Sequence, residues 1–200
     1  MRHIPALLIC AILGAASCNN TTEETKETTA TEATEQSQEP SLPPQSKLDE
    51  ANTQRLMNVV TRYYELKDAL VATSPVRANS GANGLLKSAT DFKQYLTIDS
   101  INGKMLLPYV DTVIDGSKAI LADVKDSTTE KKRVIFESIS NSMFALLKAA
   151  ELKNTKIYRQ YCPMAFNDKG AYWLANETEI RNPYFGKKML ECGEVTDTLK

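Results

Sequence analysis

The sequence has few of the residues that most often carry chemistry, since its 200 residues include one histidine, His3, and four cysteines. It has no haem-attachment motif, no Gly-x-Ser-x-Gly nucleophile motif, no P-loop and no Gly-x-Gly-x-x-Gly dinucleotide motif. No apolar run reaches the roughly 18 residues that a membrane-spanning helix needs. We therefore expect a protein without catalytic activity. The composition, 42% apolar and 24% charged, excludes a fibrous or wholly disordered chain.

The formal net charge of −1 is distributed unevenly along the chain. Residues 1–17 carry +1 and residues 19–46 carry −5, whereas the rest of the chain carries +3, from 22 basic and 19 acidic side chains. Such a small excess spread over a body of this size gives no basic stripe that could neutralise many phosphates. We expect no nucleic-acid partner.

The amino terminus predicts export. A short basic start leads into an apolar stretch, and Ala15, Ala16 and Ser17 place small residues directly before Cys18. This pattern predicts a secretory signal peptide over residues 1–17. Small residues that lead into a cysteine resemble the lipobox of bacterial lipoproteins, although Ala15 stands where leucine is more usual. We predict that Cys18 is lipidated and anchors the protein to the membrane of the bacterial cell envelope, facing the periplasm or the outer surface. The alternative is an ordinary signal peptide in which Cys18 is incidental.

The segment after the predicted anchor has the composition of a tether. Residues 19–46 contain seven threonines, six glutamates and three prolines, but no aromatic residue and one leucine. A segment with so few apolar side chains cannot bury enough surface to offset its ordering entropy. We therefore predict a disordered tether over residues 18–46 that holds the folded body away from the membrane.

The remaining chain has a mainly α pattern in two parts. Apolar residues recur at steps of three and four over residues 47–152 and predict four helices with short connections near residues 74, 98–104 and 125–127. The expected helices cover about 48–73, 75–96, 106–124 (with Pro108 in the first turn) and 130–150 (with a capping box from Ser127 to Glu130). Such helices favour a four-helix, up-and-down antiparallel bundle.

The last part, residues 153–200, has a different pattern. Residues 156–164 and 171–174 are predicted to be extended, with a turn between them, and Asn182-Pro183 is predicted to open a short helix through Glu191. Seven of the fourteen aromatic residues lie between Tyr158 and Phe185. We expect a small carboxy-terminal lobe of short strands plus one short helix, packed on the bundle because it is too small to fold alone.

Cysteine use then limits the chemistry. Removal of the signal peptide takes away Cys10 and His3, so the folded body keeps Cys162 and Cys192 and has no imidazole. On a strand Cys162 and Met164 would share a face, and on a helix Met189 and Cys192 would do so. If the two pairs converge, thiolates and thioethers form a candidate metal site selective for Cu(I), whereas thiolates alone would also accept Zn(II).

The alternative for these cysteines is structural. A disulfide between Cys162 and Cys192 would close a loop of about 30 residues and contribute roughly 3–4 kcal/mol. Met164 and Met189 would then be ordinary core side chains. The two interpretations are also compatible with one pair that switches with redox state.

Several segments resemble the DUF3347 family. They are Tyr63 to Val71, Arg133 with Phe136 and Ser138 to Ser140, Tyr161 to Ala165, Asp168 to Leu174, Asn182 to Gly186, and Met189-Leu190 with Cys192-Gly193. The resemblance covers about residues 48–195. The family has no assigned activity, and its members occur as exported proteins and as a domain on adaptor subunits of CusB-type copper and silver efflux systems. The resemblance thus implies a link to metal handling, with efflux components as candidate partners.

Cys162-Pro163-Met164 is also similar to the Cys-Pro-Met-His core of short heavy-metal-binding domains. Ala165 stands where that core has its histidine, and Asn102 to Met105 lacks a histidine that family members often carry. Any metal site here would have to use sulfur alone, and we expect Met105 to pack in the core. The leading hypothesis is a lipid-anchored, non-catalytic binder of a soft, copper-like metal at Cys162, Met164, Met189 and Cys192. The rival hypothesis is a disulfide-stabilised protein-interaction module of the envelope.

Overall fold

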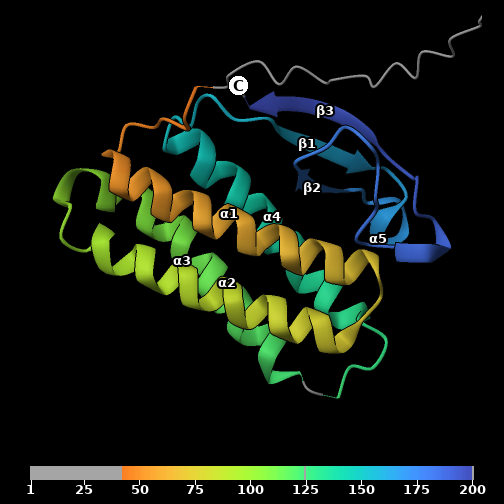
Figure 1. The fold of residues 1–200 in the computed structure, drawn as a ribbon. Coiled ribbons are helices and arrows are strands. Elements are labelled where there is room, and N and C mark those ends of the chain that lie inside the picture. Colours follow the sequence, from red (N-terminus) through yellow and green to blue (C-terminus); the bar gives the residue numbers. More distant parts are fainter. Residues whose placement is uncertain (1–41, 124, 200) are drawn as a thin grey trace, which may run out of the picture. The chain divides into compact units, whose positions relative to one another are not determined.

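The structure, a computed structural model, describes residues 42–123 and 125–199 (Figure 1). The predicted signal peptide, the predicted lipid attachment at Cys18 and most of the predicted tether lie outside these residues. The segment before the first helix is fixed to the chain that follows the fourth helix. Gln45 exchanges two backbone hydrogen bonds with Lys153 (3.2 and 2.7 Å).

Four long helices form the bundle, as the apolar spacing predicts. They are α1 (Glu50–Val71), α2 (Pro75–Leu96), α3 (Ser100–Ala122) and α4 (Glu130–Ala149). Ser74 caps α2 and Pro75 occupies its first turn, as expected. None of the helices in the described ranges is both long enough and apolar enough to cross a membrane.

Consecutive helices pack against one another: α1 on α2, α2 on α3 and α3 on α4. Their apolar stripes meet in one buried core, which confirms the predicted bundle. Between α1 and α4 the contact is made by large side chains, with the Tyr63 ring stacked on Phe136 at a centroid distance of 5.2 Å.

The third helix begins earlier than the sequence pattern predicts. The Asp99 carboxylate accepts hydrogen bonds from the backbone N–H groups of Ile101 and Asn102 (3.1 and 3.0 Å), so the helix starts at Ser100. Pro108 therefore lies in the helix interior rather than in the first turn. Met105, expected in the core, is 44% exposed. A strong aspartate cap thus extends the helix over a segment predicted to be a connection.

The fourth helix also starts differently from the expectation. Thr129 precedes it with a left-handed backbone (φ 67°) and makes no capping bond from its side chain. Instead the Asp126 carboxylate accepts hydrogen bonds from the N–H groups of Lys132 (3.3 Å) and Thr128 (3.1 Å). Partial burial opposes ionisation, but these bonds and that from the Thr128 hydroxyl lower the pKa of Asp126. The predicted capping box at residues 127–130 is wrong.

The carboxy-terminal lobe is a three-stranded antiparallel sheet in the order β2–β1–β3. Its strands are β1 (Ile157–Cys162), β2 (Ala171–Ala175) and β3 (Glu194–Leu199). The predicted turn between the first two strands contains the single turn α5 (Ala165–Asp168), where Phe166 and Asn167 have positive φ angles. The sequence pattern did not predict β3.

The predicted helix over residues 182–191 is not formed. That segment contains only the 3₁₀ turn η1 (Gly186–Lys188), because Gly186 has φ +56° and Met189 has non-helical backbone angles (φ −148°, ψ 63°). The fold is therefore mainly α with a small β lobe, and β2 packs against α4 while η1 contacts α1. Figure 1 shows this sheet beside the bundle, on the side of α1 and α4.

Candidate functional site

The fold brings Cys162 and Cys192 together at one end of the lobe sheet. Cys162 is the last residue of β1, and Tyr161 beside it pairs with Glu194 of the antiparallel strand β3. A side chain added at Gly193 would lie 2.7 Å from the carbonyl oxygen of Tyr161, so the chain that carries Cys192 runs tightly along β1. Both thiols are free; Cys162 is fully buried and Cys192 is half-buried.

The two thiols influence each other directly. Burial is the largest cause that raises the pKa of Cys192 to about 11, and hydrogen bonding and charge interaction with Cys162 raise it further. An interaction with the backbone N–H of Met164 lowers the pKa by a smaller amount. Cys192 is thus a protonated thiol at neutral pH, and it lies close enough to Cys162 for the two thiols to interact.

The expected alignment of Met164 with Cys162 is wrong. Met164 lies beyond the end of β1, in a turn conformation (φ −84°, ψ −7°), so the strand spacing that would place both side chains on one face does not apply. Its side chain is 46% exposed, whereas Cys162 is buried. Met164 contributes its backbone N–H to the thiol pair.

Met189 also departs from the expectation. Because no helix spans residues 189–192, the spacing of three residues does not put Met189 and Cys192 on a common face. Its backbone carbonyl accepts a hydrogen bond from the Cys192 N–H (3.3 Å). The structure therefore brings the two cysteines together, and neither thioether is placed by the predicted strand or helix.

Asn182 fixes the loop that carries Cys192. This side chain is fully buried, and its Nδ2 donates to the Cys192 carbonyl oxygen (2.7 Å). Its Oδ1 accepts from the backbone N–H groups of Tyr184 (2.7 Å) and Phe185 (3.2 Å). From the sequence, Asn182 is expected only to open a short helix together with Pro183. An asparagine before proline in an aromatic-rich motif was the signal available for its wider role.

Arg133 of α4 connects this loop to the bundle. Its guanidinium donates to the Pro183 carbonyl oxygen and, over 2.9 Å, to the Thr73 hydroxyl after α1. Gly186 packs directly against Thr73, because a side chain at position 186 would clash with the Thr73 Oγ1. The position of Cys192 therefore depends on α1, α4 and the loop together.

Aromatic rings close the inner side of the site. Tyr184 packs edge-on to Trp173 (5.9 Å between centroids) and lies 6.0 Å from Phe136. A side chain at Gly193 would lie 2.8 Å from the Trp173 ring. Cys162 is consequently buried in the core, whereas Cys192 is partly exposed.

Within residues 42–123 and 125–199, no group of three or more histidine, cysteine, aspartate or glutamate side chains is arranged to hold a metal ion. A metal at this site would therefore rely on the two thiolates, with donors of other kinds completing its coordination.

A family described as a protein of unknown function (DUF3347) matches the chain over residues 59–155. This confirms the resemblance for the helices. The match ends before β1, so the Cys-Pro-Met and Asn-Pro-Tyr-Phe-Gly segments lie beyond it, and it is shorter than the predicted 48–195. No curated protein and no solved structure matches the chain.

Proposed function

On the premise that residues 59–155 belong to the DUF3347 family, for which no function is known, we propose that this protein binds a soft metal ion without catalysing a reaction. The ion is Cu(I), held by the thiolates of Cys162 and Cys192. The observation that carries the proposal is the meeting of these two thiols, which lie on separate segments of the chain, where β1 ends and β3 begins.

The donor chemistry fits this ion. Thiolates and thioethers prefer Cu(I) to hard cations, and the described residues offer no cluster of carboxylates or imidazoles at this point. The half-buried Cys192 gives access from solvent, and the Met164 N–H stabilises the thiolate form of Cys192. Metal binding displaces the thiol protons, so affinity should increase with pH. Met164 and Met189 are the candidate thioether ligands, through side-chain movements of the flexible methionines.

The place of action is part of the proposal. The signal pattern of residues 1–17 and the small residues before Cys18 support an exported protein that is lipid-anchored at Cys18 in the bacterial envelope. The acidic tether would let the body reach a partner at the membrane, for which metal-efflux components are the candidates. Labelling cells with a palmitate analogue should modify the native chain and not its Cys18→Ser variant. Equal labelling of both chains would refute the anchor.

The experiment that tests metal binding is competition for Cu(I) against a chromogenic chelator. The full chain is used with Cys10 and Cys18 replaced by serine, so that only Cys162 and Cys192 supply thiols. The reduced protein should withdraw about one equivalent of Cu(I) from the chelator, and Cys162→Ser or Cys192→Ser should remove this ability. The double variant Met164→Leu/Met189→Leu measures the share of the thioethers and leaves both thiols in place.

The result that would overturn metal binding is equal and weak competition by the reduced protein and by both serine variants. Circular dichroism of each variant shows whether the fold is kept. If the methionine double variant keeps full affinity, the two thiolates alone bind the metal, and Met164 and Met189 are not ligands.

The same contact between the thiols favours a second candidate function. Two adjacent cysteines in an exported protein are also what a stabilising disulfide requires, and the protein would then be an interaction module. Mass spectrometry after alkylation, with and without a reductant, separates the two. Complete protection of both cysteines in unreduced protein isolated from the envelope, with no Cu(I) uptake after reduction, would favour the disulfide.

A further inference from the structure

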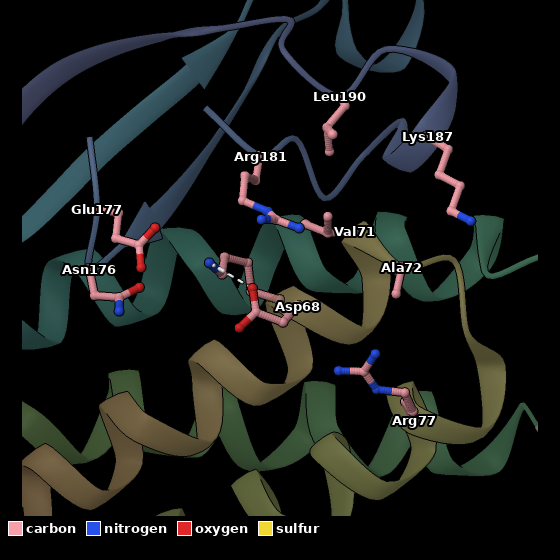
Figure 2. A pocket seen from close by; sticks show the side chains of 10 residues that line it. Asp68, Val71, Ala72, Arg77, Asn176, Glu177, Arg181, Lys187 and Leu190 are labelled. Atoms are coloured by element: carbon pink, nitrogen blue, oxygen red, sulfur yellow. Dashed lines mark ion pairs between the residues drawn. The ribbon is translucent and has the colours of Figure 1, made fainter. Parts of the chain in front are cut away.

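A hollow lies next to the C-terminal end of α1, and neither cysteine is among the residues that line it. It has a volume of about 460 Å³ and lies between α1, α2 and the loop that follows β2. Cations from four segments line it: Lys67 from α1, Arg77 from α2, Arg181 from the loop that follows β2, and Lys187 from η1. Figure 2 shows Arg181 above and Arg77 below the last turn of α1.

The charges in this hollow do not balance. Four cations stand against two carboxylates, Asp68 and Glu177, which leaves a net charge of +2. Lys67, itself buried, pairs with Asp68 over 2.9 Å, and this pair is the dashed line in Figure 2. Arg77, Arg181 and Lys187 have no carboxylate within 4.0 Å among the described residues. Convergence of like charges is unfavourable, and an anion would remove that cost.

The segment between β2 and β3, which supplies Arg181 and Lys187, is fixed by hydrogen bonds to its backbone. The fully buried Gln160 of β1 donates from Nε2 to the carbonyl oxygens of Glu177 (2.9 Å) and Glu179 (3.1 Å). Farther along, the backbone N–H of Asn182 donates to the Leu190 carbonyl oxygen (2.8 Å). Arg181 therefore projects from an anchored backbone, which restricts where its guanidinium can lie.

We propose that this hollow binds a small organic oxyanion, a dicarboxylate or a phosphate monoester, through Arg77, Arg181 and Lys187. Guanidinium groups match the oxygens of carboxylate and phosphate with paired hydrogen bonds, and the net charge suits a dianion. Val71, Ala72 and Leu190 supply apolar surface for a short carbon skeleton. The volume falls within the range of about 300–1,000 Å³ that is usual for small-molecule sites.

The test is calorimetric titration of the purified full chain, kept reduced and metal-free, with three probes: succinate, glycerol phosphate and vesicles of phosphatidylglycerol. Succinate or glycerol phosphate should bind, and Arg77→Gln or Arg181→Gln should weaken binding about tenfold or more. Arg77 and Arg181 are both exposed, so the variants should keep the fold, which circular dichroism verifies. The matched control is Arg62→Gln, which removes one exposed positive charge of α1 outside the hollow.

Each outcome has a defined meaning. Binding of vesicles alone, with the same dependence on Arg77 and Arg181, would assign the hollow to a singly charged lipid phosphodiester and so overturn the proposed dianion. No binding of any probe would overturn the proposal, and so would equal weakening by Arg62→Gln and Arg181→Gln. Because the thiols take no part in this titration, its result is independent of Cu(I) binding.

Discussion

A single side chain, Arg133, joins the lobe to the bundle. It is almost fully buried, and burial lowers the pKa of its guanidinium. Removing an arginine from water is costly, but its hydrogen bonds satisfy the Pro183 carbonyl oxygen and the Thr73 hydroxyl. Loss of the guanidinium would leave the Pro183 carbonyl buried and unpaired. The cost of that lost partner should exceed the gain from no longer burying the charge.

We therefore predict that Arg133→Met lowers the free energy of unfolding by about 2–4 kcal/mol. Urea denaturation of the variant and the native protein measures this difference in the free energy of unfolding. The control is Lys131→Met on the same helix, where an exposed ammonium lies 3.7 Å from Asp123. That change should stay within about 0.5 kcal/mol. A loss as small for Arg133→Met as for Lys131→Met would show that Arg133 does not hold the loop.

The thiol of Cys192 should show an unusual pH dependence. Its ordinary pKa of 9.0 is raised to about 11, so the folded state holds the proton more tightly than the unfolded state does. The contribution of this protonated thiol to the free energy of unfolding is therefore complete below pH 9, and it is lost as the pH rises through about 11. Alkylation of Cys192, followed by peptide mass spectrometry, should therefore reach half its maximal rate near pH 11. Cys162→Ser should move this midpoint down, and a wild-type midpoint at pH 9 would contradict the assignment.

At the scale of elements, α1 and α2 approach closely at one glycine. A side chain at Gly81 would lie 2.9 Å from the Cα and N atoms of Leu66, which are backbone atoms and cannot yield easily. One turn later, a side chain at Gly84 would meet the end of the flexible Arg62 side chain at 3.2 Å. These two glycines on one helix therefore have different roles.

Gly81→Ala should destabilise the protein by about 1–3 kcal/mol, because the two helices must separate. Gly84→Ala should be neutral or stabilise it by up to about 1 kcal/mol, because alanine is the better helix former. The melting temperatures of both variants show whether helix packing or helix propensity determines the effect at each position. Equal effects of the two substitutions would show that close packing at Gly81 is unimportant.

Element by element, apolar spacing was enough to predict the four helices, because one face of each is buried in a common core. The third strand could not be predicted, since Glu194 to Asp197 are exposed and show no alternation; β3 is held by backbone pairing with β1. The contact between Cys162 and Cys192 agrees with both interpretations of the cysteines. The methionine ligands depended on a strand and a helix that Met164 and Met189 do not join.

In the part of the chain that the structure describes, the lobe covers the side of the bundle where α1 and α4 meet, because β2 packs on α4 and η1 contacts α1. The Tyr63 hydroxyl, whose pKa burial raises, lies 2.8 Å from the Ser140 hydroxyl and accepts a hydrogen bond from the backbone N–H of Leu174 (3.0 Å). One tyrosine of α1 thus contacts both α4 and β2. Without the lobe, the Tyr63 hydroxyl would lose the Leu174 N–H and the Phe136 ring would lose its contact with Tyr184. Bundle and lobe should therefore depend on each other for stability.

The single tryptophan makes that dependence measurable. Trp173 is buried in β2, so its fluorescence reports on the lobe, whereas circular dichroism at 222 nm reports mainly on the helices. Because Trp173 packs on Tyr184, which in turn packs on Phe136 of α4, we predict that both signals change at the same urea concentration. Arg133→Met should lower this shared midpoint without splitting it. Fluorescence that changes at a lower urea concentration than the helical signal would instead show a lobe that unfolds on its own.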